Sequence, residues 1–234
     1  MLNYDKKLVK LKTILNNWSK RYLTPIGKIT VVKSLLISQF NHFFISLPNP
    51  SENFMKTLNN ILFNFVWNNK PDKIKREIII KNYEEGGLKM LHLKSFISAL
   101  KLSWIRKILR GECKSLKILE KEINIIYLLN CGKEYTRKCF HNIKNLFWKD
   151  VLLSFEELQT KYKNDSSEYF LKTPLFHNSC LKIGGVPIFY KRWFLKGIYY
   201  INDLYNKDGI PMTYNEFIGM LDIKTNFLEF QGIQ

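Results

Sequence analysis

Acidic residues are scarce in this sequence, and the motifs of several common catalytic sites are missing. Its 234 residues include 20 Asp and Glu against 37 Lys and Arg, a formal charge of +17 at pH 7. There is no P-loop, dinucleotide-binding glycine motif or Gly-x-Ser-x-Gly turn, so we expect no cofactor. A positive surplus of this size destabilises the compact chain by self-repulsion unless an anionic partner offsets it. Nucleic acid is the commonest such partner, and an anionic membrane surface is the second.

Cysteine is scarce as well. The four cysteines are too few and too scattered for a disulfide scaffold, which favours a reducing compartment. Structural zinc sites usually contain two closely spaced cysteines, and Cys131 and Cys139 lie too far apart for that pattern. His141, His177 and Cys180 complete no zinc knuckle. We expect free, buried cysteines and no metal site.

Long apolar runs and a leader-like start are also missing. Residues 1–12 carry charges throughout, so they do not have the pattern of a signal peptide. The longest apolar stretch, residues 29–47, is interrupted by polar residues, whereas a membrane-spanning helix needs about 20 mostly apolar residues. We expect this stretch to form a buried helix. We also expect the protein to be intracellular, in the cytoplasm or nucleus, without membrane association.

The positive charge is concentrated at one end of the chain. Residues 1–110 contain 20 Lys and Arg against 6 Asp and Glu, whereas residues 111–234 contain 17 against 14. Such asymmetry is typical of chains in which one part binds a polyanion. An AT-rich genome would also enrich lysine, but it would not explain why acids are scarce only in the first part.

The apolar residues recur at three- and four-residue steps, which predicts a mainly α-helical protein. Thr24 and Pro25 can begin a helix that runs to about Ser46, and Ser51 can cap the next one. A further basic helix ends at Gly111, where we place the boundary between a basic helical region, residues 1–110, and a second helical region, residues 111–234.

Shorter signals punctuate both regions. The β-branched run Ile78–Ile80 followed by Gly86 and Gly87 predicts a small β-hairpin near residues 76–91. A turn is expected at residues 184–187. The pairs Ser154 with Glu157 and Thr213 with Glu216 have the spacing of helix capping boxes.

Several landmarks in the first region occur in a characteristic order. They are Trp18, Arg21, Leu23, Thr24, Gly27, Lys28, Lys33, Pro48, Pro50, Trp67, Gly86-Gly87-Leu88, Ala99-Leu100 and Trp104-Ile105. This order resembles the region that follows the catalytic palm in LINE-type, non-LTR retrotransposon reverse transcriptases, and it covers roughly residues 8–110. The resemblance implies a helical thumb. More weakly, residues 174–217 resemble the C-terminal extension of such elements, for which no chemistry follows.

The chain departs from this family where its chemistry lies. RNA-directed DNA polymerisation needs palm carboxylates that hold two divalent metals, and the family's hallmark is an aromatic-x-Asp-Asp turn. This sequence contains no Asp-Asp pair, and we expect no room for a palm before residue 8. The resemblance therefore implies a non-catalytic fragment that contacts RNA, DNA or their hybrid without reading sequence.

A thumb holds a duplex through basic side chains and through backbone N–H groups at helix starts. Trp18, Trp67 and Trp104 are expected in the core. The candidate nucleic-acid-binding residues are Lys20, Arg21, Thr24, Gly27, Lys28, Lys33, Lys94, Lys101, Arg106 and Lys107. Each has an ordinary alternative, since a lysine can simply solvate a helix face. The runner-up interpretation is a structural or interaction protein, or a pseudogene product without activity, that self-associates through exposed apolar surface.

Overall fold

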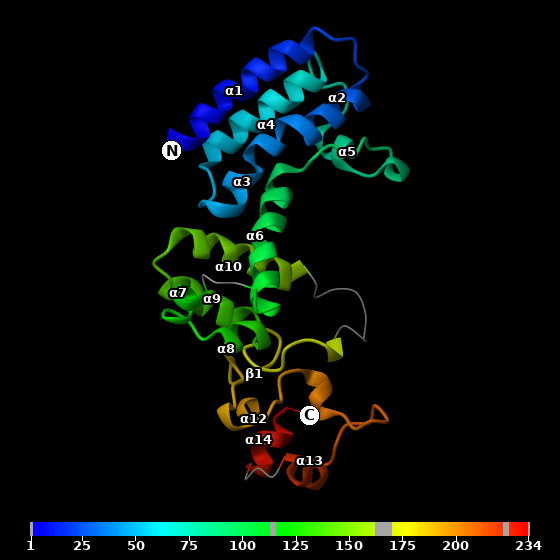
Figure 1. Ribbon diagram of the computed structural model, residues 1–234. Coiled ribbons are helices and arrows are strands. Elements are labelled where there is room, and N and C mark those ends of the chain that lie inside the picture. The colour runs from blue at the N-terminus through cyan, green and yellow to red at the C-terminus, as the bar shows by residue number, and fades with distance from the viewer. Residues whose placement is uncertain (1, 113–115, 162–169, 222–224, 234) are drawn as a thin grey trace. The chain divides into compact units, whose positions relative to one another are not determined.

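The computed structural model describes residues 2–112, 116–161, 170–221 and 225–233 (Figure 1). The protein is mainly α-helical, as predicted, with one small two-stranded antiparallel sheet among the described residues. The chain divides into two compact units, residues 1–104 and 105–234. We call them the first unit and the second unit. The division falls within a helix rather than at Gly111.

The first unit begins with helix α1 (Leu2–Ser19), followed by one long helical segment. That segment consists of α2 (Pro25–Val31), a π-helical turn (Val32–Leu36) and α3 (Ser38–Ser46). Its start is the predicted one, because Pro25 occupies the first turn and Thr24 Oγ1 accepts a hydrogen bond from the Gly27 N–H at 3.2 Å. The π turn, marked by the bond from the Ile37 N–H to the Val32 carbonyl, was not predicted.

Helix α4 (Glu52–Val66) lies beside α1 and α2. As predicted, Ser51 caps it, with Oγ accepting from the Phe54 N–H at 3.3 Å. The helix ends in a turn where Asn68 and Asn69 both have positive φ angles. The Asn69 N–H donates to the Asn64 carbonyl at 2.7 Å, which closes the helix end with the pattern of a Schellman motif.

The predicted β-hairpin near residues 76–91 is wrong. Ile78–Ile80 belong to a short helix, α5 (Arg76–Ile80), and a 3₁₀ turn (Tyr83–Glu85) follows. Ile79 is fully buried, and its carbonyl accepts from the N–H groups of Leu88 and Met90. A helical turn therefore buries the central isoleucine and satisfies the returning chain without a strand pair.

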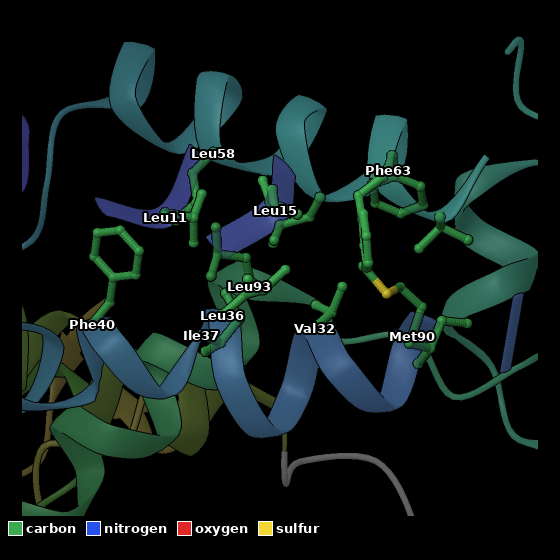
Figure 2. Close-up of a cluster of buried hydrophobic side chains, with 14 of the residues drawn as sticks. Leu11, Leu15, Val32, Leu36, Ile37, Phe40, Leu58, Phe63, Met90 and Leu93 are labelled. Atoms are coloured by element: carbon green, nitrogen blue, oxygen red, sulfur yellow. The ribbon is translucent and has the colours of Figure 1, made fainter. Parts of the chain in front are cut away.

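Helices α1 to α4, together with Met90 and the start of α6 (Leu93–Leu109), enclose one hydrophobic core. Figure 2 shows its centre, with side chains from α1, from the segment 25–46 and from α4 directed at one another. Trp18 packs partly buried against this core and Trp67 is buried within it. Such a continuous apolar interior gives the basic side chains a rigid support.

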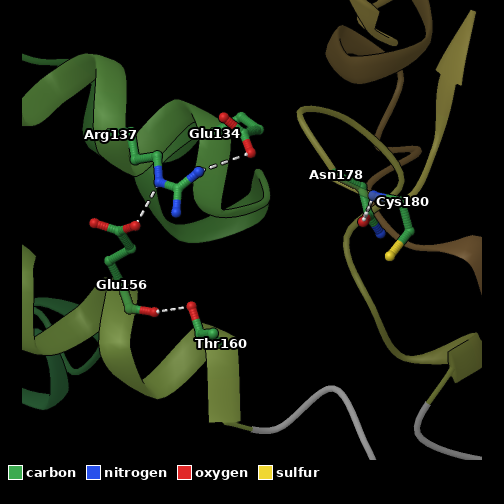
Figure 3. A network of polar contacts seen from close by, with 6 residues as sticks. All are labelled: Glu134, Arg137, Glu156, Thr160, Asn178 and Cys180. Atoms are coloured by element: carbon green, nitrogen blue, oxygen red, sulfur yellow. Dashed lines mark hydrogen bonds and ion pairs between the residues drawn. The ribbon is translucent and has the colours of Figure 1, made fainter. Parts of the chain in front are cut away.

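The second unit begins within α6, which ends at Leu109, and the predicted Gly111 lies in the turn that terminates the helix. Gly111 has a φ of 69°, and the N–H groups of Gly111 and Glu112 bond back to Ile108 and Lys107. Four helices follow: α7 (Leu116–Glu120), α8 (Ile125–Asn130), α9 (Lys133–Asn142) and α10 (Leu146–Lys161). Arg137 of α9 pairs with Glu134 at 3.2 Å and with Glu156 of α10 at 2.5 Å. Figure 3 shows both pairs.

The rest of the second unit is short elements around an aromatic core. They are β1 (Lys182–Ile183), β2 (Val186–Pro187), α12 (Lys191–Leu195), a 3₁₀ turn (Ile201–Leu204), α13 (Tyr214–Leu221) and α14 (Phe227–Gln231). Their core contains Phe176, Trp193, Phe194, Phe217 and Phe230.

Three local predictions for this unit have different outcomes. Gly184 and Gly185 form the predicted turn, here joining β1 to β2, and both have positive φ angles. Thr213 and Glu216 form the predicted capping box at the start of α13. The box at Ser154 is wrong, because Ser154 is buried inside α10, whose first turn is bonded by Asn145 instead.

Candidate nucleic-acid interface

Lys20 and Arg21 lie in the connection between α1 and α2, and both are exposed. The Arg21 guanidinium lies 4.3 Å from the centre of the Trp18 ring, and the Arg21 N–H donates to the Trp18 carbonyl at 3.1 Å. Trp18 therefore has two roles, since one part packs on the core and another supports the guanidinium. Tyr22 is fully exposed beside them.

Thr24 and Gly27 form the first turn of α2, but that turn is largely satisfied within the protein. The Gly27 N–H donates to Thr24 Oγ1, and the Lys28 N–H donates to the Thr24 carbonyl at 2.9 Å. Pro25 has no N–H, so only the Ile26 N–H of this turn is left for a ligand. The expected phosphate-binding helix start thus reduces to a single backbone donor.

Lys28 is buried, with 2% of its surface exposed, so it does not fit the surface role predicted for it. Its Nζ donates to the Phe65 carbonyl at 3.1 Å and to Asn68 Oδ1. Burial lowers the pKa of this ammonium group. A cation at the last carbonyls of α4 satisfies orphan acceptors and complements the helix dipole.

Lys33 is exposed on the π turn and lies near Lys89. Desolvation and, second, the charge of Lys89 lower the pKa of Lys33. Lys89 was not among the predicted residues; its φ is 54° and its Nζ lies 4.9 Å from the centre of the Tyr83 ring. Two cations that repel each other are a favourable place for a phosphate.

Helix α6 contributes two of the predicted cations to the first unit. Lys94 is exposed, near the helix start. Lys101 is fully buried, and its Nζ donates to the Leu47 carbonyl at the end of α3. Trp104 Nε1 donates to the Ile45 carbonyl at 2.7 Å. Lys101, like Lys28, therefore binds a helix end of the protein itself and is not positioned for nucleic acid.

Arg106 and Lys107 lie beyond the division, in the second unit. Arg106 is exposed and Lys107 is half-buried. The ten predicted residues therefore fall into four groups. The first unit has four exposed cations, two residues of a capped helix turn and two buried lysines, and the second unit has two cations. In that order they are Lys20, Arg21, Lys33 and Lys94; Thr24 and Gly27; Lys28 and Lys101; and Arg106 and Lys107.

Sequence reasoning missed a basic run between α4 and α5. Lys70, Lys73 and Lys75 are all exposed, and Arg76 pairs with Asp72 at 2.8 Å. The charge run itself was the available signal. In total the first unit contains 17 Lys and Arg against 6 Asp and Glu, so its acids cannot neutralise its cations.

The cysteines of the second unit are the side chains to examine for a metal site. Cys131 and Cys139 are both buried, as predicted, and Cys180 is exposed, whereas Cys113 lies outside the described residues. Burial raises the pKa of Cys131 to about 12 and that of Cys139 to about 11. Across the described chain, no three His, Cys, Asp or Glu side chains gather as a metal site would require.

No protein-family model matches the chain. Among the described residues, no helix is both long and apolar enough to span a membrane.

Proposed function

We propose that the first unit binds RNA, DNA or their hybrid through its exposed cations, as the thumb-like part of a LINE-type reverse transcriptase without the catalytic carboxylates. The observation that carries this proposal is the excess of 17 basic over 6 acidic residues on a unit with a closed apolar core. The sequence resemblance over residues 8–110 supports the same assignment.

The exposed cations come from separate elements that share one support. Lys20 and Arg21 follow α1, Lys33 lies on the π turn, and Lys94 lies on α6, and all three elements pack on the same core. Phosphate contacts of this kind fix a nucleic acid in place but carry no sequence information. The expected activity is therefore binding that tolerates any sequence.

The test is a salt titration of affinity for a short RNA–DNA hybrid, measured with the full chain by fluorescence anisotropy. Each phosphate neutralised releases counterions, so the logarithm of affinity should fall linearly with the logarithm of salt concentration, by about 0.7 to 0.9 per contact. Size-exclusion chromatography of the same sample should show a monodisperse species. An affinity that does not change between low and physiological salt, or a soluble aggregate, would contradict the proposal.

Arg21→Ala tests the contact at a single residue. We expect it to weaken binding to two unrelated hybrid sequences equally and to reduce the salt slope by about 1. Lys196→Ala, an exposed lysine of the second unit, is the matched control and should leave the affinity nearly unchanged. A loss confined to one sequence would indicate base readout instead.

A further inference from the structure

A polar pocket of about 450 Å³ lies where the end of α1 meets the end of α4. Figure 1 shows both helix ends at the same end of the bundle, beside the connection from α1 to α2. We call this cavity the Asn pocket, because four of its lining residues are asparagines. Its lining is Leu15, Asn16, Ser19, Ile61, Asn64, Phe65, Asn68 and Asn69.

The lining combines amide groups with an apolar base. Leu15 and Phe65 are buried core residues, whereas the four asparagines are exposed. A carboxamide offers both a donor and an acceptor, as does the edge of a nucleobase. The volume of the Asn pocket lies in the range of small-molecule sites, which usually combine apolar surface with a few polar groups.

The wall formed by Asn68 and Asn69 is held in place by the fold. Both residues have positive φ angles, which asparagine tolerates better than most residues. The Asn68 side-chain oxygen accepts from the buried Lys28 ammonium, so its amide NH₂ is the group left to donate. The buried lysine thus positions a pocket residue as well as capping α4.

Lysines follow the pocket residues in the chain at the end of α1 and after α4. Lys20 directly follows Ser19, and Lys70 directly follows Asn69, and both lysines are exposed. Exposed charges that a polyanion can contact therefore lie at residues adjacent in the chain to the pocket lining. Another cavity of the unit, about 680 Å³ between the starts of α1 and α4, includes the acidic residue Asp5 in its lining. The carboxylate of Asp5 repels a polyanion, so we do not assign this cavity to the bound strand.

From these observations we infer that the Asn pocket takes one unpaired nucleobase of the nucleic acid that the first unit binds. This inference rests on the proposed function and adds a preference for strands with an unstacked base. Stacking and hydrogen bonding of such a base add affinity without additional charge contacts.

The test compares three hybrids with the full chain: a blunt duplex, the same duplex with one bulged nucleotide, and that bulge made abasic. The two bulged ligands carry equal charge, so counterion release is the same for both. We expect the base-containing bulge to bind about fivefold tighter than the abasic one, the value of roughly one net hydrogen bond. A 2-aminopurine base in the bulge should change its fluorescence on binding.

Asn16→Ala and Asn17→Ala form a matched pair, because both asparagines are exposed on α1 and only Asn16 lines the pocket. Alanine favours a helix, so both variants should fold. Asn16→Ala should remove the difference between the bulges, and Asn17→Ala should keep it. Equal affinities for the two bulges with the unaltered chain would overturn the pocket while leaving salt-dependent duplex binding intact. Loss of salt-dependent binding itself would instead contradict the proposed function.

Discussion

At the scale of single residues, the environment of each lysine decides its role. Lys28 and Lys101 are buried, where an unpaired charge would be costly, and each donates to carbonyls at the end of a neighbouring helix. Lys33 has no such buried position and lies beside another cation. The same side chain therefore stabilises the fold at two positions and remains available to a polyanion at the third.

Lys28→Met and Lys33→Met test this division of roles. Lys28→Met keeps the aliphatic chain but removes the buried hydrogen bonds from the ammonium group to the Phe65 carbonyl and to Asn68 Oδ1, so we expect it to lower the free energy of unfolding by about 1–3 kcal/mol. Its effect on hybrid affinity should be small at temperatures where the variant is folded. Lys33→Met should change stability by less than about 0.5 kcal/mol and reduce the salt slope by about 1.

Urea denaturation and anisotropy titrations on both variants provide the measurements. If Lys28→Met weakened binding without a loss of stability, the structural role assigned to Lys28 would be wrong.

The buried lysines could have been recognised from helical spacing. Lys28 is followed at four-residue steps by Val32, Leu36, Phe40 and Phe44, all buried, and Lys101 lies four residues from both Ile97 and Ile105. We predicted surface positions for both lysines because a thumb contacts phosphates through basic side chains on helix faces. The partners, a carbonyl at the end of α4 and one after α3, belong to other helices, so sequence alone could not identify them.

At the scale of elements, local chemistry predicted helix starts better than strands. Thr24, Ser51 and Thr213 cap their helices as predicted, because a cap depends only on residues within one turn. Ile78–Ile80 had the composition of a strand but became a helical turn, because burial of Ile79 in the core was stronger than β-propensity.

Gly86 and Gly87 are adjacent but should respond differently to substitution. Gly86 has a φ of 76° with open space around it, so Gly86→Ala should cost about 1 kcal/mol of conformational strain. At Gly87 an added Cβ would lie 2.1 Å from the Lys81 carbonyl oxygen. We expect Gly87→Ala to cost more than about 2 kcal/mol, since backbone must move. Thermal unfolding of both variants measures the difference, and equal losses would contradict this account.

At the scale of the whole molecule, the two units differ in charge and in how their boundary is encoded. The net charge is +11 for residues 1–104 and +6 for residues 105–234. Gly111 marks a helix end, which is a local signal and was predicted. The division within α6 depends instead on which residues pack together, and Lys101 and Trp104 hold the first part of α6 to the end of α3. The spacing of apolar residues along the chain does not indicate those bonds, because they join separate helices.

The second unit should make the stability of the molecule depend on pH in both directions. Burial lowers the pKa of His177, so below about pH 6.5 the unfolded chain binds a proton that the folded imidazole does not, and stability falls. Burial raises the pKa of Cys131 to about 12, so above about pH 8.5 the unfolded thiol loses a proton that the folded one keeps, and stability falls again. The free energy of unfolding, measured by urea denaturation from pH 5 to 10, should therefore have a maximum near neutrality.

Two variants test the two groups separately. His177→Asn, chosen because residue 177 has a φ of 51°, should reduce the loss of stability at acid pH, and Cys131→Ala should reduce the loss at alkaline pH. Unchanged profiles in both variants would show that these two buried groups do not control the pH dependence.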